Sequence, residues 1–249
     1  MYVQRTYRCG QSSQDLYFFQ VRLKETDLYI GVDRKMYTPE LVKIAEELVW
    51  QYRNQLELYI QEDPEFRITF EPHFLLPTAP AIARIMGQAA WQAGVGPMAA
   101  VAGAIAEAVG RGLLTKVREV MVENGGDIFL KIRRPRLVGI FAGTSPYSHR
   151  LALEIDPRWG ALGVCTSSGT VGPSFSAGRA DAAVILAPST ALADAAATAV
   201  GNVVQTPADV EKGLKLARSI QGVIGAVVIK EDKLAAWGKV KLVPLTVDR

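Results

Sequence analysis

Cysteine and histidine are both scarce in this sequence. The 249 residues contain two cysteines, Cys9 and Cys165, and two histidines, His73 and His149. Two cysteines so far apart form neither a disulfide framework nor a zinc cluster, and two histidines rule out a multi-histidine metal site. They also argue against a Ser-His or Cys-His catalytic pair. Any metal bound by this chain must therefore be held mainly by oxygen atoms.

Strong net charge and long apolar runs are also absent. The net charge is +3 at pH 7, which is too small to favour binding to nucleic acid or membrane. The N-terminus has no apolar stretch behind a basic start, so it does not resemble a signal peptide. Glu107 and Asp194 interrupt the longest apolar segments, which fall short of the roughly 18 residues of a membrane span. We therefore expect a soluble, cytoplasmic protein that binds neither nucleic acid nor membrane.

The composition is that of an ordinary globular protein. Apolar residues make up 49% of the chain and charged residues 21%, and the length suffices for one large domain or two small ones. The sequence contains no repeat, low-complexity segment or linker. We therefore expect residues 1–249 to form a single α+β domain of two closely packed lobes.

Hydrophobic periodicity and turn residues predict the elements. The predicted helices cover residues 38–60, 80–93, 97–109, 189–202 and 206–220. The predicted strands cover a hairpin over 16–32 with its turn at 25–27, and 117–122, 128–132, 137–141, 151–155, 182–187, 223–229 and 237–243.

The helix predicted from Pro97 contains almost only small side chains. Its N-terminus at Gly96-Pro97-Met98 presents free amides that could receive an anion. The alternative is a plain helix–helix corner, with Met98 in the core.

Two glycine-bearing segments are candidates for phosphate contacts. Asn124-Gly125-Gly126-Asp127 marks a tight turn, and Gly126 would let a ligand approach the backbone. The loop expected from Cys165 to Gly172 supplies hydroxyls from Thr166, Ser167, Ser168 and Thr170, together with Gly169. Hydroxyls and freed amides surround phosphates in many proteins, but turns are rich in the same residues for local reasons.

Cys165 stands at the head of this expected loop. Hydroxyl and amide donors around it could stabilise a thiolate and lower the pKa of the thiol. The alternative is that Cys165 is a small buried hydrophobe.

Asp194 and Thr198 lie four residues apart on the alanine-rich helix and so share one face. A carboxylate and a hydroxyl on one face suit a hard divalent cation such as magnesium. Alternatively, Asp194 is favoured near a helix N-terminus by the helix dipole, with Thr198 packed inside.

Four segments together resemble a known family. They are Val95–Gly103, Glu123–Ile128, Cys165–Gly172 and Leu192–Ala199. In this order they are similar to the uncharacterised ApbE-like family, a cytoplasmic branch of the ApbE superfamily, and the likeness extends from Lys24 to Gly238. The resemblance implies an ApbE-like, T-fold-like α+β domain with mixed or antiparallel sheets packed against helices.

The better understood members of that superfamily split FAD and attach FMN, through its phosphate, to a threonine or serine of a partner protein. The resemblance implies FAD or FMN and magnesium as cofactors, with Asp194 and Thr198 as the metal ligands. Cys165 and Asp127 are the predicted catalytic residues. The predicted flavin-nucleotide contacts are Gly96, Met98, Asn124, Gly125, Gly126, Thr166, Ser167, Ser168, Gly169 and Thr170.

The sequence departs from the transferases at two places. Their histidine-x-x-aspartate-proline segment should follow the serine-glycine loop, but Pro173–Ser176 follows here without a histidine. Their N-terminal region, which grips the adenosine and the isoalloxazine, is not recognisable in Met1–Pro77.

Three hypotheses follow. The first is a magnesium-dependent enzyme that acts on FAD or another nucleotide pyrophosphate, with FMN transfer to an acceptor protein as its specific form. The second is a protein of cytoplasmic sulfur assimilation that carries a persulfide on Cys165. The third is a module that binds a phosphorylated small molecule without chemistry, and homo-oligomer formation stays open for all three. The functional expectation rests on convergence of the glycine-bearing turns and the alanine-rich helix on one anion-binding pocket. A structure with Asp194 far from both Gly126 and Ser168 would exclude that pocket.

Overall fold

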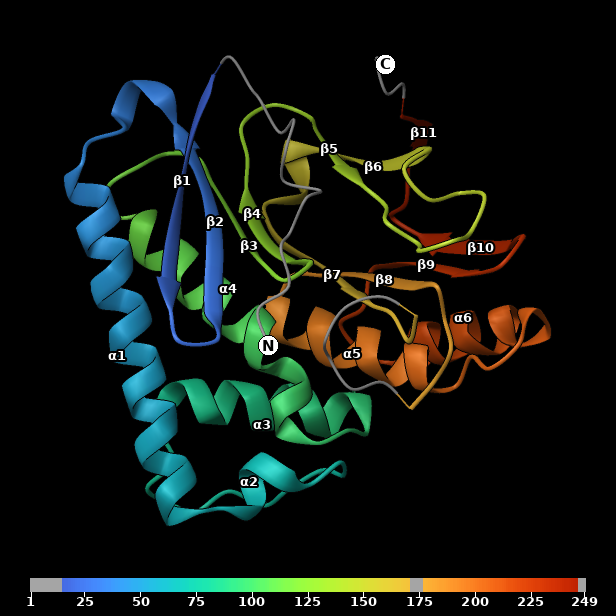
Figure 1. The fold of residues 1–249 in the computed structure, drawn as a ribbon, viewed down its shortest axis with the longest axis horizontal. Helices are drawn as coiled ribbons and strands as arrows, with labels where there is room; N and C mark the ends of the chain where they lie inside the picture. The colour runs from blue at the N-terminus through green and yellow to red at the C-terminus, as the bar shows by residue number, and fades with distance from the viewer. Residues whose placement is uncertain (1–14, 171–176, 246–249) are drawn as a thin grey trace.

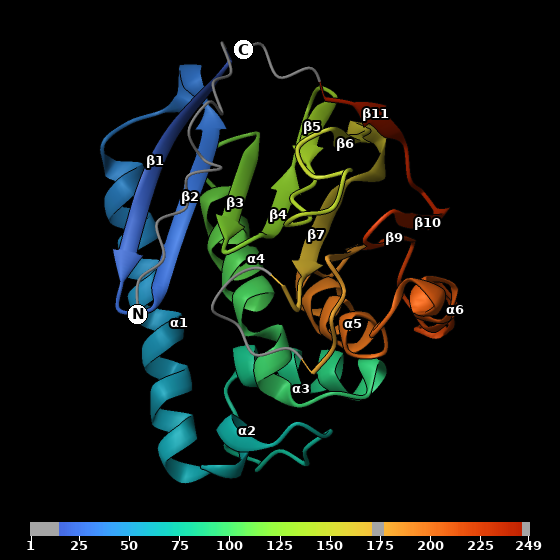
Figure 2. The same ribbon diagram turned by 45° about the vertical axis from the view of Figure 1, so that its right-hand side comes forward.

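A computed structural model describes residues 15–170 and 177–245 of the chain (Figures 1 and 2). The strands are β1 (Leu16–Leu23), β2 (Thr26–Asp33), β3 (Val120–Asn124), β4 (Asp127–Lys131), β5 (Arg136–Gly139), β6 (Leu151–Ile155), β7 (Ala161–Ser167), β8 (Ala182–Ala187), β9 (Gly225–Lys230), β10 (Lys233–Gly238) and β11 (Leu242–Pro244). The α-helices are α1 (Glu40–Glu62), α2 (Glu65–Ile68), α3 (Ala81–Ala93), α4 (Val101–Leu113), α5 (Thr190–Asn202) and α6 (Val210–Ser219). Short 3-10 turns are η2 (Arg34–Met36), η3 (Pro97–Ala100), η4 (Pro157–Trp159) and η5 (Pro207–Asp209).

The centre of the fold is an eight-stranded sheet in the order β1-β2-β3-β4-β7-β8-β9-β10. Every neighbouring pair in it is antiparallel. Strand β8 is buried along its whole length, as expected of an uninterrupted apolar run in the middle of a sheet. Helices α1, α4, α5 and α6 cover one face, with α3 packed against α4 and α5, and the small sheet β11-β6-β5 covers the other face (Figures 1 and 2).

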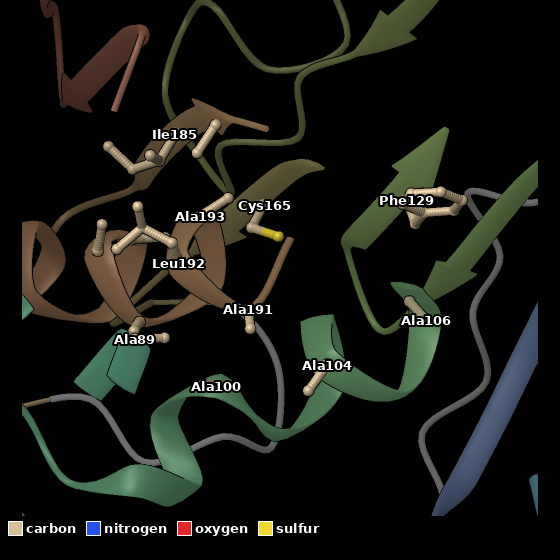
Figure 3. Packing of buried hydrophobic residues seen from close by; sticks show 14 of the residues in the cluster. Ala89, Ala100, Ala104, Ala106, Phe129, Cys165, Ile185, Ala191, Leu192 and Ala193 are labelled. Atoms are coloured by element: carbon tan, nitrogen blue, oxygen red, sulfur yellow. The ribbon is translucent and has the colours of Figure 1, made fainter. Parts of the chain in front are cut away.

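Each face has its own hydrophobic core. The core on the helical face is the larger and contains Cys165 and Phe129 (Figure 3). The core between the two sheets is aliphatic and contains Leu130, Leu153 and Leu162. Successive residues of a strand point to opposite faces, so one strand feeds both cores. The architecture confirms the predicted α+β class with antiparallel sheets packed against helices.

Most predicted elements are confirmed, and four are corrected. The hairpin turn predicted at 25–27 lies at residues 24–25, because β2 already begins at Thr26. Cys165, Thr166 and Ser167 are not in a loop but form the end of β7, which lies between β4 and β8. The helix predicted from Pro97 begins with the 3-10 turn η3, and α4 follows from Val101 to Leu113. The strand predicted over 237–243 is divided between β10 and β11.

Helices α4 and α5 cross in very close contact at Gly103. A Cβ atom built on Gly103 would lie 2.4 Å from the carbonyl oxygen of Thr190 and 2.9 Å from Cβ of Asp194. Any larger residue at this position would therefore push the two helices apart. The small side chains of both helices allow this approach.

A helix that crosses a membrane must be both long and apolar. Within residues 15–170 and 177–245, no single helix meets both conditions. In the same ranges, the pair Ala81–Ala93 and Pro97–Leu113, bent by 104°, has the required length and composition when the two helices are taken together.

Candidate functional site

The sheet brings Asp127 and Cys165 together. Ile128 of β4 pairs with Val164 of β7, so the same register places Asp127 opposite Cys165. The carboxyl of Asp127 interacts with the thiol of Cys165, whose sulfur also donates to the carbonyl oxygen of Thr190 at 3.5 Å. Cys165 lies between α5 and β4 (Figure 3). Strand, turn and helix thus meet at one buried place.

Asp194 reaches the same place from α5. Its Oδ2 accepts a hydrogen bond of 2.8 Å from the amide of Gly103, and the amide of Ala102 also donates to this carboxyl. These amides belong to the first turn of α4, whose own N-cap residue Ala100 supplies no side-chain cap. A carboxylate from another helix therefore caps α4, and the dipole of α4 favours it there.

The electrostatics of this place are dominated by burial and by like charge. The side chains of Asp127 and Asp194 belong to residues that are only 8% and 9% exposed. Burial, followed by the negative charge of Asp127, raises the pKa of Asp194 well above its ordinary value, against the hydrogen bonds from Gly103 and Ala102. Two buried carboxyls that repel each other form a place where a proton or a cation is stabilised.

The expectation of a lowered pKa for Cys165 is wrong. Cys165 is fully buried, and burial together with the charges of Asp127 and Asp194 raises the pKa of its thiol well above the ordinary value. The hydroxyl-rich surroundings suggested by the sequence do not act on the sulfur, because Cys165 sits inside a strand rather than in a loop.

The turn between β3 and β4 is built as its sequence indicates. Gly125 and Gly126 have φ angles of 72° and 108°, which residues other than glycine rarely adopt. The amide of Gly126 donates a hydrogen bond of 2.9 Å to Oε1 of Glu123. Nδ2 of Asn124 donates to the carbonyl oxygen of Ala102 at 3.1 Å. The turn is therefore fastened to the N-terminal end of α4, beside Asp194.

The hydroxyls of Thr166 and Ser167, which follow Cys165, lie on opposite faces of the sheet. Thr166 alternates with Cys165 along β7 and so points to the other face of the sheet. Ser167 faces the helical side, where its Oγ lies 3.2 Å from a Cβ built on Gly201 of α5. Only one of these two hydroxyls therefore faces the helices.

Ser168, Gly169 and Thr170 turn towards the start of β8. The amide of Gly169 donates to the carbonyl oxygen of Ala180 at 2.9 Å, and Ser168 Oγ donates to the same oxygen at 3.4 Å. Oγ1 of Thr170 donates to Oδ1 of Asp181 at 3.1 Å. The predicted convergence thus holds for Asp194 and the Gly126–Asp127 turn, whereas this segment is bonded to Ala180 and Asp181.

Gly96 and Met98 lie at the entry to α4. A Cβ atom on Gly96 would lie 2.0 Å from the carbonyl oxygen of Thr69, so Gly96 serves close packing of two backbone segments. Met98 is partly buried against the helical-face core. The anion site predicted at the N-terminus of this helix is occupied by a side chain of the protein itself, because the amides of Ala102 and Gly103 donate hydrogen bonds to the carboxyl of Asp194.

Thr198 marks the side of α5 that opens outwards. Every residue from Thr190 to Gly201 is buried except Thr198, which is half-buried, and Asn202 four residues later is half-buried too. Asp194, Thr198 and Asn202 therefore follow one face of the helix from the interior to the surface.

These residues fit a magnesium ion that is only partly held by protein. In the described part of the chain, no three or more His, Cys, Asp or Glu side chains form a metal-binding group. Magnesium is commonly held by one or two carboxylates, with water and substrate phosphates completing its shell. Asp194, with the neighbouring Asp127 and with Thr198 on the same helix face, provides that donor set, and a cation would relieve the repulsion between the two carboxyls.

One residue of this arrangement escaped the sequence reasoning. Oε2 of Glu107, on α4, accepts a hydrogen bond of 2.7 Å from the amide of Thr190, the first residue of α5. Arg111 pairs with the other oxygen, Oε1, at 2.7 Å. Each helix therefore receives a carboxylate from the other at its N-terminus. The signal was a lone acid in an apolar helix, which the sequence reasoning used only against a membrane span.

Comparisons with known proteins place the chain in a family. The UPF0280 protein of Methanosarcina acetivorans is 44% identical over 221 residues, which are 88% of this chain and 85% of that protein. The UPF0280 protein of Methanosphaerula palustris is 45% identical over 210 residues, 83% of this chain and 86% of that one.

Solved structures share the fold at low identity. A mutant of the flavin transferase ApbE from Vibrio cholerae matches with a TM-score of 0.61 and 14% identity, over 90% of this chain and 97% of that one. The apo form of the flavinyl transferase ApbE from Pseudomonas stutzeri matches with a TM-score of 0.59 and 14% identity, over 90% and 94%. A family model described as AbpE bacteria matches residues 9–231. The chain therefore belongs to this ApbE-like family, as its motifs predicted.

Proposed function

We propose that this chain is a magnesium-dependent enzyme that acts on FAD or another nucleotide pyrophosphate, with transfer of FMN to a hydroxyl of an acceptor protein as its specific form. The observation that carries the proposal is the meeting of Asp127 and Asp194 at the N-terminus of α4, with Thr198 leading outwards. The fold shared with two flavin transferases supports it.

Asp194 and Thr198 would hold the magnesium ion, which when bound would neutralise charge on the pyrophosphate. Transfer forms a bond between the acceptor oxygen and the phosphorus of FMN and breaks the pyrophosphate bond, so AMP leaves. Asp127 is the carboxyl that we assign to the proton of the acceptor hydroxyl. The Asn124 amide and the Glu107 carboxylate keep the turn, α4 and α5 in register around it.

Product analysis tests the proposal directly. The purified chain is incubated with FAD and magnesium, with water in place of the acceptor hydroxyl. AMP is quantified by chromatography, and flavin binding is followed by fluorescence. We expect AMP to appear and to vanish in Asp194→Asn and Asp127→Asn. The matched control is Asp209→Asn, which removes a helix-capping carboxylate at the start of α6, away from α4.

The outcome that contradicts the proposal is also specific. Absence of both AMP and flavin binding in a chain that unfolds cooperatively ends it. If Asp194→Asn releases as much AMP as the parent chain, the reaction does not depend on the carboxyl of Asp194.

Two alternatives remain as hypotheses. A binding module without chemistry predicts that FAD or FMN binds tightly while no AMP is formed. A persulfide carrier predicts that Cys165→Ala abolishes growth on limiting sulfide, but full burial and the raised pKa of the thiol disfavour this role.

A further inference from the structure

The outer edge of the large sheet, formed by β1, is a second feature that the proposed function does not use. Among the described residues, β1 pairs with β2 alone, and it lies at the end of the strand order. Figure 2 shows β1 at the side of the molecule with α1 next to it. An unpaired strand edge is a template for another strand.

The register shows which main-chain groups face outwards. The amide of Arg34 donates to the carbonyl oxygen of Asp15 at 2.9 Å, which makes Asp15–Arg34 a hydrogen-bonded pair. Bonded and non-bonded positions alternate along antiparallel strands, and Leu16 pairs with Asp33 one step further. The amides and carbonyls of Phe18 and Gln20 therefore point away from β2, towards the free edge.

A groove of about 610 Å3 lies along this edge, between β1 and α1. The strand contributes Val21, Arg22 and Leu23, and the helix contributes Glu46, Glu47, Trp50 and Gln51. Trp50, one of several large apolar side chains on the surface, is 61% exposed. Exposed aromatic groups beside a polar rim are typical of interaction sites.

The α1 side of the groove is acidic, whereas Arg22 on the strand side pairs with Asp27 at 3.5 Å. Glu46 and Glu47 are exposed, and neither forms an ion pair with any residue in the described ranges. Other acids of the same helix region are paired, for example Glu57 with Lys24 at 2.6 Å. The two carboxylates are thus left to attract a cation, although the chain as a whole carries net positive charge.

We propose that this edge binds an extended, basic peptide segment of a partner protein as an added strand. The outward main-chain groups of Phe18 and Gln20 pair with the backbone of the segment. Its side chains on the α1 side alternate with those on the far side, so an apolar residue and a Lys or Arg two positions apart both face the groove. The apolar side chain packs on Val21 and Trp50, and the cation meets Glu46 and Glu47.

The probe is a labelled, acetylated heptapeptide of sequence Thr-Val-Thr-Lys-Thr-Val-Thr. The control peptide has the same sequence with glutamate in place of lysine. Binding to the full chain is measured by fluorescence polarisation. We expect the lysine peptide to bind about tenfold more tightly than the glutamate peptide, since the exchange replaces attraction to Glu46 and Glu47 by repulsion from both. The double variant Glu46→Lys, Glu47→Lys reverses that preference, whereas Glu211→Lys on α6 changes nothing.

The backbone contact has its own test. Methylating the peptide nitrogens at one alternate set of positions abolishes binding, and methylating the other set leaves it intact. Equal tolerance of both sets overturns the added strand, as does a failure of both peptides to bind. Analytical ultracentrifugation gives a further test. A homodimer of the parent chain that the double variant dissociates would also overturn the proposal, because the groove would then bind a second copy of the chain. AMP release from FAD is independent of all these outcomes.

Discussion

The two faces of the eight-stranded sheet differ in what the same strands deliver to them. On the helical face, β4 and β7 contribute Asp127 and Cys165, which meet Asp194 from α5. On the other face, the neighbouring residues Ile128 and Val164 pack into an aliphatic core under the small sheet. Strand alternation thus gives the helical face the cluster of Asp127, Cys165 and Asp194, whereas the other face buries a mainly aliphatic core, with the ion pair of Glu119 and Arg136 beside it.

Leu153→Ala tests the aliphatic face and has the largest expected effect on stability. Leu153 is fully buried in β6, and a Leu-to-Ala change in a core costs about 3 kcal/mol because it leaves a cavity. Chemical unfolding measures the loss. Magnesium and FAD binding per folded molecule should stay at the parent level, and a loss of binding in the folded variant would break the separation of the two faces.

Gly103→Ala tests the crossing of α4 and α5. The added Cβ would meet the Thr190 carbonyl oxygen at 2.4 Å, so the helices must shift, at a cost of about 2 kcal/mol. Unlike Leu153→Ala, this variant should also lose ligand binding, because Asp194 moves with α5. A variant that unfolds earlier but binds FAD normally would show that the crossing does not set the site.

The helices and strands on the two faces of the sheet could largely be predicted from the sequence. The contacts between them that form the candidate site could not. The apolar run of β8 ends at Pro188, and Ser189 caps α5, so local signals fix both elements. Thr166 and Ser167 have the composition of a turn, and only their pairing with Val184 and Ala183 of β8 makes them part of a strand.

Long-range contacts were beyond any local pattern. Spacing placed Asp194 and Thr198 on one helix face. That Oδ2 of Asp194 caps α4 depends on a contact between residues 91 positions apart. The raised pKa of Cys165 likewise follows from tertiary burial, which overrides the polar neighbours in its sequence.

Glu107→Gln sharpens the comparison with a smaller change. The Glu107 carboxylate accepts from the first amide of α5, and losing its charge weakens this bond by about 1 kcal/mol. Denaturant unfolding should report that loss, with a weaker apparent affinity for FAD and magnesium. The exposed partner Arg111 gives the matched control, since Arg111→Gln leaves the bond to Thr190 in place. Equal affinities in both variants would deny Glu107 a positioning role.

Cys165 should show the smallest response. In a Cys9→Ser background, we expect the thiol to resist a disulfide reagent in the native state and to react fully after denaturation, because it is buried with a raised pKa. The absorbance of the released thiolate follows the reaction. Rapid labelling of the native protein would mean that the sulfur of Cys165 is accessible, and it would favour the hypothesis that Cys165 carries a persulfide.

Unfolding of the parent chain and of Asp194→Asn, with and without magnesium, tests the central claim most directly. The raised pKa of Asp194 means that the metal-free folded chain retains a proton that the unfolded chain releases once the pH exceeds the ordinary pKa of an aspartate carboxyl. Stability from this group therefore falls as the pH rises beyond that ordinary value, and a cation bound at Asp194 offsets the fall. We predict that magnesium at neutral pH raises the unfolding temperature of the parent and leaves that of Asp194→Asn unchanged. An equal rise in both proteins would contradict a cation site at the buried carboxyl pair.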